Sequence, residues 1–174
     1  IFSLEELKAS FFVERISKAG AKFDFEKAKW FNHEWIKASS VERLKLSVKS
    51  ELSKSEIEVT DDKKLAEVIE LVKDRCTLLP DFVAQTAYFF ATPSEYDSAA
   101  VKPKWNADKA AFFEEFANTL NVELSAVELE AAFKALAESK GLKPGEVMLP
   151  LRIVLVGGKF GPGVFDIVKL LGKA

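Results

Sequence analysis

Hydrophobic residues recur with helical spacing along most of the chain. After Ser39, the residues Val41, Leu44, Val48 and Leu52 fall on one face of a helix. Similar spacing predicts six further inward stripes: Ala28, Phe31 and Trp35 after Asp24; Leu65, Val68, Ile69, Val72 and Cys76 after Thr60; Phe82, Tyr88 and Phe89 within 81–90; Phe112, Phe113, Phe116 and Leu120 within 106–120; Leu129, Ala132, Phe133 and Leu136 after Ser125; and Phe165, Val168 and Leu171 near the end. The pattern predicts an all-α fold of about eight to ten helices.

Helix boundaries carry their own signals. Serine followed three residues later by glutamate is a capping box, and it occurs as Ser3 with Glu6, Ser39 with Glu42, and Ser125 with Glu128. Gly141 can end the helix that follows Ser125 in a left-handed C-cap. We therefore expect helices to begin at these serines.

Two segments interrupt the helical pattern. Residues 91–105, "ATPSEYDSAAVKPKW", contain two prolines and two serines and are predicted to be a loop that separates two bundles. Residues 151–156, "LRIVLV", are β-branched and apolar, which fits a buried strand or a short buried helix, because six residues are too few for periodicity to decide.

Composition limits the chemistry. A chain of 174 residues that is 48% hydrophobic and holds 15 phenylalanines can bury a core, and Cys76 is expected within it. One cysteine and one histidine, His33, make a zinc site improbable. No apolar run is long enough to span a membrane, and residues 1–20 lack the core of a signal peptide. A reducing cytoplasm is the expected location.

Charge is unevenly distributed. The net charge of −2 argues against a nucleic-acid partner. However, residues 1–54 hold 11 basic against 8 acidic residues, and residues 141–174 hold 5 against 2. These two basic ends could face a polyanion if they converge, or they could be ordinary solvated charge.

Residues 156–165, "VGGKFGPGVF", form a glycine-rich loop. It lacks the Ser/Thr that follows lysine in a P-loop, and its spacing does not fit a dinucleotide fingerprint. Such a loop does expose backbone beside Arg152 and Lys159, and Pro162 and Phe165 could offer an apolar surface to an unstacked RNA base. A tight turn between helices is the alternative.

Two segments resemble a known family. Residues 14–36, "ERISKAGAKFDFEKAKWFNHEWI", and residues 149–173, "LPLRIVLVGGKFGPGVFDIVKLLGK", are similar to the C-terminal half of bacterial glutamyl-tRNA synthetases. The resemblance implies a stem-contact region over 1–54 and two anticodon-binding helical subdomains over 55–98 and 99–174. It also implies that "LRIVLV" is helical. The family's catalytic motifs are absent, so this chain is expected to be inactive alone, with no cofactor of its own and with ATP and Mg in the absent catalytic half.

The resemblance also implies site residues, none of them catalytic or metal-binding. Arg75 would face the third anticodon base and Arg152 the first. The remaining anticodon positions would be Lys159, Gly161, Pro162, Gly163, Val164 and Phe165. Contacts to the tRNA stem would come from Lys27, Lys29, Asn32 and Lys37, whereas Trp30, Phe31 and Trp35 are expected in the core.

The resemblance implies a glutamate-accepting tRNA as partner, and we expect a monomer without membrane contact. Two other hypotheses stay open from the residues alone. One is a helical protein-interaction scaffold with the loop as a plain turn, and the other is an enzyme that holds a nucleotide at the glycine loop.

Overall fold

The computed structural model describes residues 2–16, 19–20, 22–102 and 105–172, and these residues form helices and no strand, which confirms the all-α prediction. The α-helices are α1 (Leu4–Ser10), α2 (Phe25–Ala38), α3 (Val41–Lys54), α4 (Asp62–Val72), α5 (Asp81–Thr86), α6 (Ser98–Val101), α7 (Ala107–Thr119), α8 (Ala126–Ser139), α9 (Pro144–Val156) and α10 (Val164–Leu171). Short 3₁₀ turns follow at η1 (Val13–Arg15), η2 (Lys73–Arg75) and η3 (Ala87–Phe89). No helix among these residues is long and apolar enough to cross a membrane.

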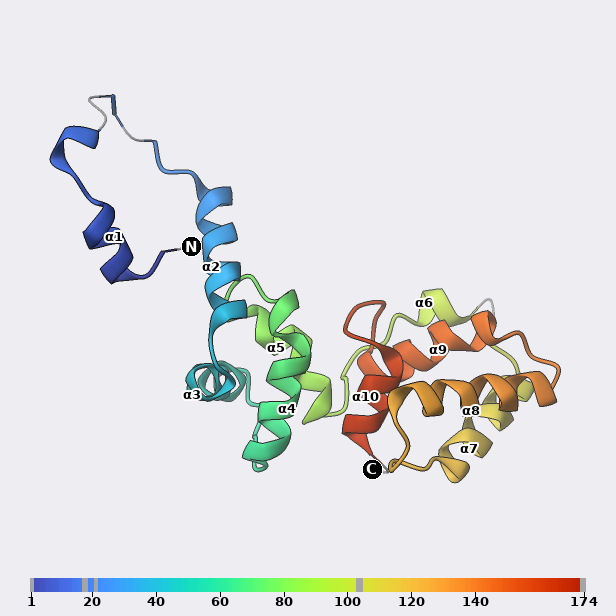
Figure 1. Cartoon of the computed structure of the whole chain (residues 1–174). Coiled ribbons are helices and arrows are strands. Elements are labelled where there is room, and N and C mark those ends of the chain that lie inside the picture. Colours follow the sequence, from blue (N-terminus) through green and yellow to red (C-terminus); the bar gives the residue numbers. More distant parts are fainter. Residues whose placement is uncertain (1, 17–18, 21, 103–104, 173–174) are drawn as a thin grey trace.

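Helices α3, α4 and α5 pack together into a first bundle (Figure 1). The predicted stripe of α3 is buried, since Leu44, Val48 and Leu52 all lie in its core. Cys76 is fully buried in the same core, as expected, and burial raises the pKa of its thiol to about 12. This cysteine therefore acts as a small apolar side chain.

Helices α7 to α10 form a second bundle, with Phe133 of α8 at its centre. The ring of Phe133 is fully buried and meets three other buried rings edge to face, those of Phe112, Phe116 and Phe165, at centroid distances of 5.1, 4.9 and 5.5 Å. These pairs add to the stabilisation that burial alone provides. The stripe predicted for 106–120 is thus a core stripe, but Ala132 of α8 is exposed and Ala137 is buried instead.

A third apolar cluster joins the two bundles. Its buried members are Val68 of α4, Tyr88 and Phe89 of η3, Val156 of α9 and Ile167 of α10. Helix α10 packs against both α4 and η3, so the last helix of the chain contacts the first bundle. The predicted loop after residue 90 passes this junction and contains the one-turn helix α6; Pro103 and Lys104 lie outside the described residues (Figure 1).

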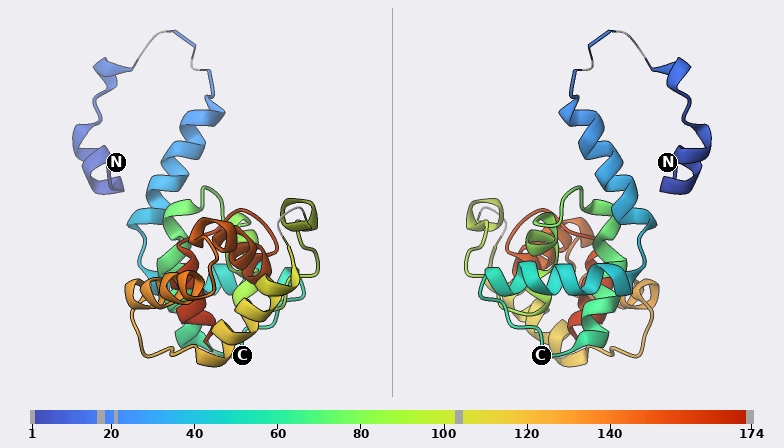
Figure 2. Two further views of the ribbon diagram at one scale, coloured as in Figure 1. Left: turned by 90° about the vertical axis from the view of Figure 1, so that its right-hand side faces the viewer. Right: turned by 90° about the vertical axis from the view of Figure 1, so that its left-hand side faces the viewer.

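The N-terminal part forms an arm, which we define as residues 2–16, 19–20 and 22–35. Figures 1 and 2 show α1 standing apart from both bundles, connected to them only through α2. Neither α1 nor η1 buries a residue, and α2 buries only Ile36 at its last turn. The core prediction for Trp30, Phe31 and Trp35 is wrong, because these side chains are 53%, 38% and 44% exposed. Helix α2 contacts the first bundle near its C-terminal end and projects away from it at its N-terminal end, so Trp30, Phe31 and Trp35 lie outside the buried clusters of the described residues.

Several predicted helix ends are confirmed and one is shifted. Both Ser3 and Ser125 form complete capping boxes, and Gly141 adopts a left-handed φ of 68°. The cap of α3 is Ser40 rather than Ser39, whose hydroxyl donates to the carbonyl of Trp35. Asp24 caps α2, and Asp61 caps α4.

The ambiguous "LRIVLV" segment lies inside α9, so it is a helix. The subdomain boundaries after residues 54 and 98 stay predictions.

Candidate functional site

The glycine-rich loop, residues 157–163, connects α9 to α10 at the junction of the bundles (Figure 1). The loop begins at Gly157, whose φ is 84°. A Cβ at this position would lie only 2.6 Å from the carbonyl oxygen of Glu95. The segment between the two bundles, residues 91–105, contacts this end of the loop through Asp97. Asp97 donates its backbone N–H to the carbonyl oxygen of Gly157 at 2.8 Å, and Lys159 Nζ lies 3.2 Å from Asp97 Oδ2. The close approach requires glycine at 157.

Arg152 holds the middle of this loop. Its Nη1 donates to the carbonyl oxygen of Phe160 at 2.9 Å and to that of Pro162 at 2.8 Å, one on each side of Gly161. Burial lowers the pKa of the guanidinium, Tyr88 raises it, and Arg75 lowers it further. Even so, an arginine stays charged at all ordinary pH values. Arg152 therefore brings a positive charge to the loop, and no hydrogen bond of its Nε or Nη2 is found among the residues that the structure describes.

Tyr88 lies beneath Gly161. A Cβ built on Gly161 would lie 3.0 Å from Tyr88 Oη and 3.7 Å from Arg152 Nη1, so both atoms face the Cα of Gly161. Tyr88 is 6% exposed, and its hydroxyl is buried without a hydrogen-bond partner among the described residues. Burial raises the pKa of Tyr88 to about 12, although the positive charges of Arg152 and Arg75 lower it. The phenol is therefore protonated at neutral pH.

Arg75 ends the η2 turn and is exposed. The nearby carboxylate of Asp81 accepts hydrogen bonds from the backbone N–H groups of Thr77 and Leu78, both at 2.8 Å. No ion pair or hydrogen bond of the Arg75 side chain is found in the described part of the chain. Its positive charge lowers the pKa of both Tyr88 and Arg152, so Arg75 lies within electrostatic range of the two groups.

The rest of the predicted loop site is mostly apolar and covered. Pro162, Val164 and Phe165 are buried, and the ring of Phe165 packs on Phe133. Gly163 is exposed at the start of α10. The exposed aromatic ring of the loop is that of Phe160, which is 44% exposed. The sequence analysis did not single it out, because it lies outside every helical stripe.

The predicted stem-contact residues lie on α2, away from the loop (Figure 1). Lys29 and Lys37 are exposed and form ion pairs along the helix with Glu26 and Glu34. Lys27 is exposed too, and no ion pair of its side chain is found within the described ranges. Asn32 Nδ2 donates to the backbone carbonyl of Thr77, which connects α2 to the segment after η2.

His33 supports the same connection between α2 and the first bundle. Its Nδ1 lies 2.9 Å from the carbonyl oxygen of Cys76, and because a carbonyl only accepts, Nδ1 is the donor. Together with Asn32, it holds the C-terminal half of α2 against the segment that follows Arg75. The structure therefore presents two separate groups of predicted residues, one on α2 and one at the junction.

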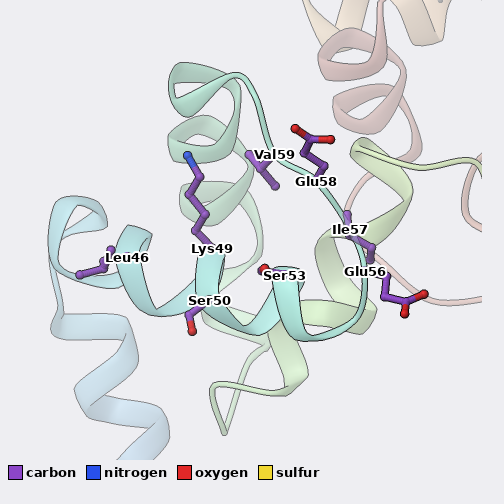
Figure 3. A pocket seen from close by; sticks show the side chains of 8 residues that line it. All are labelled: Leu46, Lys49, Ser50, Ser53, Glu56, Ile57, Glu58 and Val59. Atoms are coloured by element: carbon purple, nitrogen blue, oxygen red, sulfur yellow. The ribbon is translucent and has the colours of Figure 1, made fainter.

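A groove of about 610 Å³ lies elsewhere, between α3 and the segment that follows it, and Figure 3 shows the side chains that line it. The only basic residue that lines it, Lys49, is paired with Asp62 at 2.7 Å, and Glu56 and Glu58 contribute carboxylates. None of the predicted site residues lines this groove. The described residues also contain no group of three or more His, Cys, Asp or Glu that could hold a metal ion.

Comparison with known proteins places these features in a family. A family profile described as "Anticodon binding domain" matches residues 24–174. The glutamate–tRNA ligases of Chlorobium chlorochromatii and Porphyromonas gingivalis are each 37% identical to this chain over 99% of its length, which covers 37% and 34% of theirs. The crystal structure of a glutamate tRNA ligase from Elizabethkingia meningosepticum matches with a TM-score of 0.85 at 35% identity, over 99% of this chain and 34% of that one. The chain thus spans about a third of the length of these relatives.

Proposed function

Since this chain belongs to the family of anticodon binding domains, we propose that it is the tRNA-binding, anticodon-recognising part of a glutamate–tRNA ligase. That ligase would attach glutamate to its tRNA with ATP, and the steps that use ATP and Mg would belong to the part of the protein outside this chain. We also propose that the protein is a monomer and that it works in the cytoplasm.

The observation that carries the proposal is the exposed guanidinium of Arg75, for which no carboxylate partner is found in the described part of the chain, in electrostatic range of Arg152, which binds the glycine-rich loop. Two such guanidinium groups can both donate hydrogen bonds to one anionic or acceptor-rich ligand. They are suited to RNA, whose bases offer acceptor atoms and whose backbone is anionic. We assign Arg75 to the third anticodon base, and Arg152, Lys159 and the segment Gly161–Phe165 to the first two.

The chemistry of the third base supports a discriminating role for Arg75. Glutamate anticodons end in C and glutamine anticodons end in G. A guanidinium only donates, which suits the O2 and N3 acceptors of cytosine. Guanine presents N–H donors at N1 and N2 on the same edge, and these would oppose the cation. Arg75 would therefore attract the correct base and reject the wrong one.

The arm would provide a second RNA-binding surface. Lys27, Lys29, Lys37 and Asn32 are exposed along α2, and lysines there would neutralise phosphates of the tRNA stem without reading sequence. The apolar side chains of the arm would contact the remaining two thirds of the longer protein. The structural match to a chain about three times as long covers 99% of this one and therefore includes the arm.

The test compares binding of this chain to glutamate and glutamine tRNA at one stated salt concentration. Wild type should prefer glutamate tRNA by roughly 1–3 kcal/mol, and Arg75→Gln should remove most of that preference. The matched control is Arg43→Gln on α3, which also removes one exposed positive charge. It should leave the preference intact and weaken both complexes only slightly.

Three results would count against the proposal in different ways. Absence of binding to either tRNA would contradict the RNA-binding role and favour a protein-interaction scaffold. Equal binding of both tRNAs by wild type would contradict anticodon reading. An unchanged preference in Arg75→Gln would assign the discrimination to another residue of the junction.

A further inference from the structure

Two buried side-chain atoms lack a hydrogen-bond partner among the described residues, Gln85 Oε1 and Tyr88 Oη. A buried polar group without a partner costs free energy, and such groups are rare in native proteins. Buried tyrosine hydroxyls in particular usually find a partner. The surroundings of Tyr88 Oη point to a ligand.

Tyr88 Oη lies in a positive environment. Arg152 and Arg75 both act on it electrostatically, and no carboxylate contributes comparably. Arg152 Nη1 cannot satisfy the hydroxyl, because its two hydrogens are already donated to Phe160 O and Pro162 O. The protonated phenol is therefore an unused donor beside two cations. The partner that completes such a group is an electron-rich oxygen.

Only the loop covers this hydroxyl on the side of Gly161. Glycine at 161 leaves no side chain over Tyr88 Oη, and its φ of 97° is one that other residues rarely adopt. On another side of Tyr88, a hollow of about 760 Å³ is lined by Tyr88, by Phe160 and by Tyr96 of the segment between the bundles. A small displacement of Gly161 would open the hydroxyl to this surface.

We infer that the hydroxyl of Tyr88 is an additional RNA-binding group, which the loop covers in the free protein and which donates a hydrogen bond to an oxygen of the bound RNA between Arg75 and Arg152. This inference rests on the proposed function and adds a residue to its site. The acceptor is either a base carbonyl or a phosphate oxygen of the anticodon loop, both of which are oxygen acceptors that the two cations favour. The uncompensated hydroxyl of the free protein gains its partner in the complex.

The test is Tyr88→Phe, measured for glutamate-tRNA affinity and for stability in denaturant with the whole 174-residue chain. The variant keeps the ring that packs in the junction cluster and removes only the hydroxyl. Affinity should fall about tenfold, the usual effect of losing one hydrogen bond that includes a charged or strongly polar partner. Stability should stay equal or rise, because an unsatisfied group has been removed. The matched control, Gln85→Met, removes the other unpartnered atom and should leave affinity unchanged.

The acceptor is identified by changing the RNA. If it is a phosphate, a methylphosphonate at one anticodon-loop position should abolish the difference between wild type and Tyr88→Phe. If it is a base, replacement of that base should do so instead. Either result supports the inference.

The inference is overturned if wild type binds tRNA and Tyr88→Phe binds equally well, as expected for a hydroxyl satisfied by a trapped water. It is also overturned if the variant loses stability and affinity together. Failure of wild type to bind tRNA at all would instead overturn the proposed function, and this inference with it.

Discussion

Two capping boxes of nearly identical geometry begin helices in opposite surroundings. Ser3 donates its backbone N–H to Glu6 Oε2 at 2.7 Å in the arm, and Ser125 does the same to Glu128 at 2.8 Å in the second bundle. Helix α8, which follows Ser125, buries three side chains, whereas α1 buries none. The same local signal specifies where both helices begin. Only burial against other elements makes a helix contribute to the stability of the body.

Phenylalanine substitutions should give the largest difference in unfolding free energy between the second bundle and the arm. Phe133→Ala removes the ring at the centre of the second bundle, and we expect a loss of about 3–5 kcal/mol in the free energy of unfolding. Phe11→Ala in the arm is the control, since Phe11 is 63% exposed and packs on no core. Its effect should lie within about 0.5 kcal/mol in denaturant titration. Similar losses for both variants would mean that the arm folds against the body in solution.

Substitutions in the two capping boxes should change the free energy of unfolding by less, but the two sites have nearly the same hydrogen-bond geometry. Ser125→Ala should cost about 1 kcal/mol of unfolding free energy, because a backbone N–H at the start of a packed helix loses its acceptor. Ser3→Ala removes the equivalent bond, yet it should leave the main unfolding transition unchanged. Equal shifts of the two midpoints would show that α1 unfolds cooperatively with the bundles.

The smallest difference in stability should come from two residues at helix ends whose backbone is in the left-handed conformation. Glu56 has a φ of 60°, and backbone hydrogen bonds from Glu56 and Ile57 close the end of α3 around it. Glu56→Gly should stabilise the body by about 0.5–1 kcal/mol, since relief of left-handed strain exceeds the entropic cost of glycine. Gly141→Ala is the inverse control: a Cβ there meets nothing within 4 Å, so only its φ of 68° acts, and we expect a loss of about 1 kcal/mol. Effects of the same sign in both variants would contradict this account.

Periodicity predicted the body well, because its stripes face partners within the same chain. Leu44, Val48 and Leu52 repeat at helical spacing and are buried as expected. Phe31 and Trp35 repeat in the same way but are exposed, because spacing identifies an apolar face without identifying what covers it. The shift of a cap from Ser39 to Ser40 has a similar origin, since adjacent serines offer the same local chemistry.

The candidate site was only partly predictable. Arg75 and Arg152 came from the resemblance to a family, and the structure brings the two within electrostatic range of each other. The bonds from Arg152 to the two loop carbonyls depend on how α9 meets the loop, which no local pattern encodes. Tyr88 belonged to an expected core stripe, and it is indeed buried. Its unpartnered hydroxyl becomes visible only when residues far apart in sequence are placed together.

Under the proposed function, the cluster that joins the bundles also limits which RNA loops fit. Val68 and Tyr88 on one side, and Val156 and Ile167 on the other, pack the bundle that carries Arg75 against the helices that flank the loop at residues 157–163. A close-packed contact of this kind does not stretch continuously, because even small gaps forfeit dispersion energy. An anticodon loop with one additional nucleotide, bound at the proposed site, would therefore have to bulge that nucleotide outward. The packing of the protein core would in this way set the length of RNA loop that the site accepts.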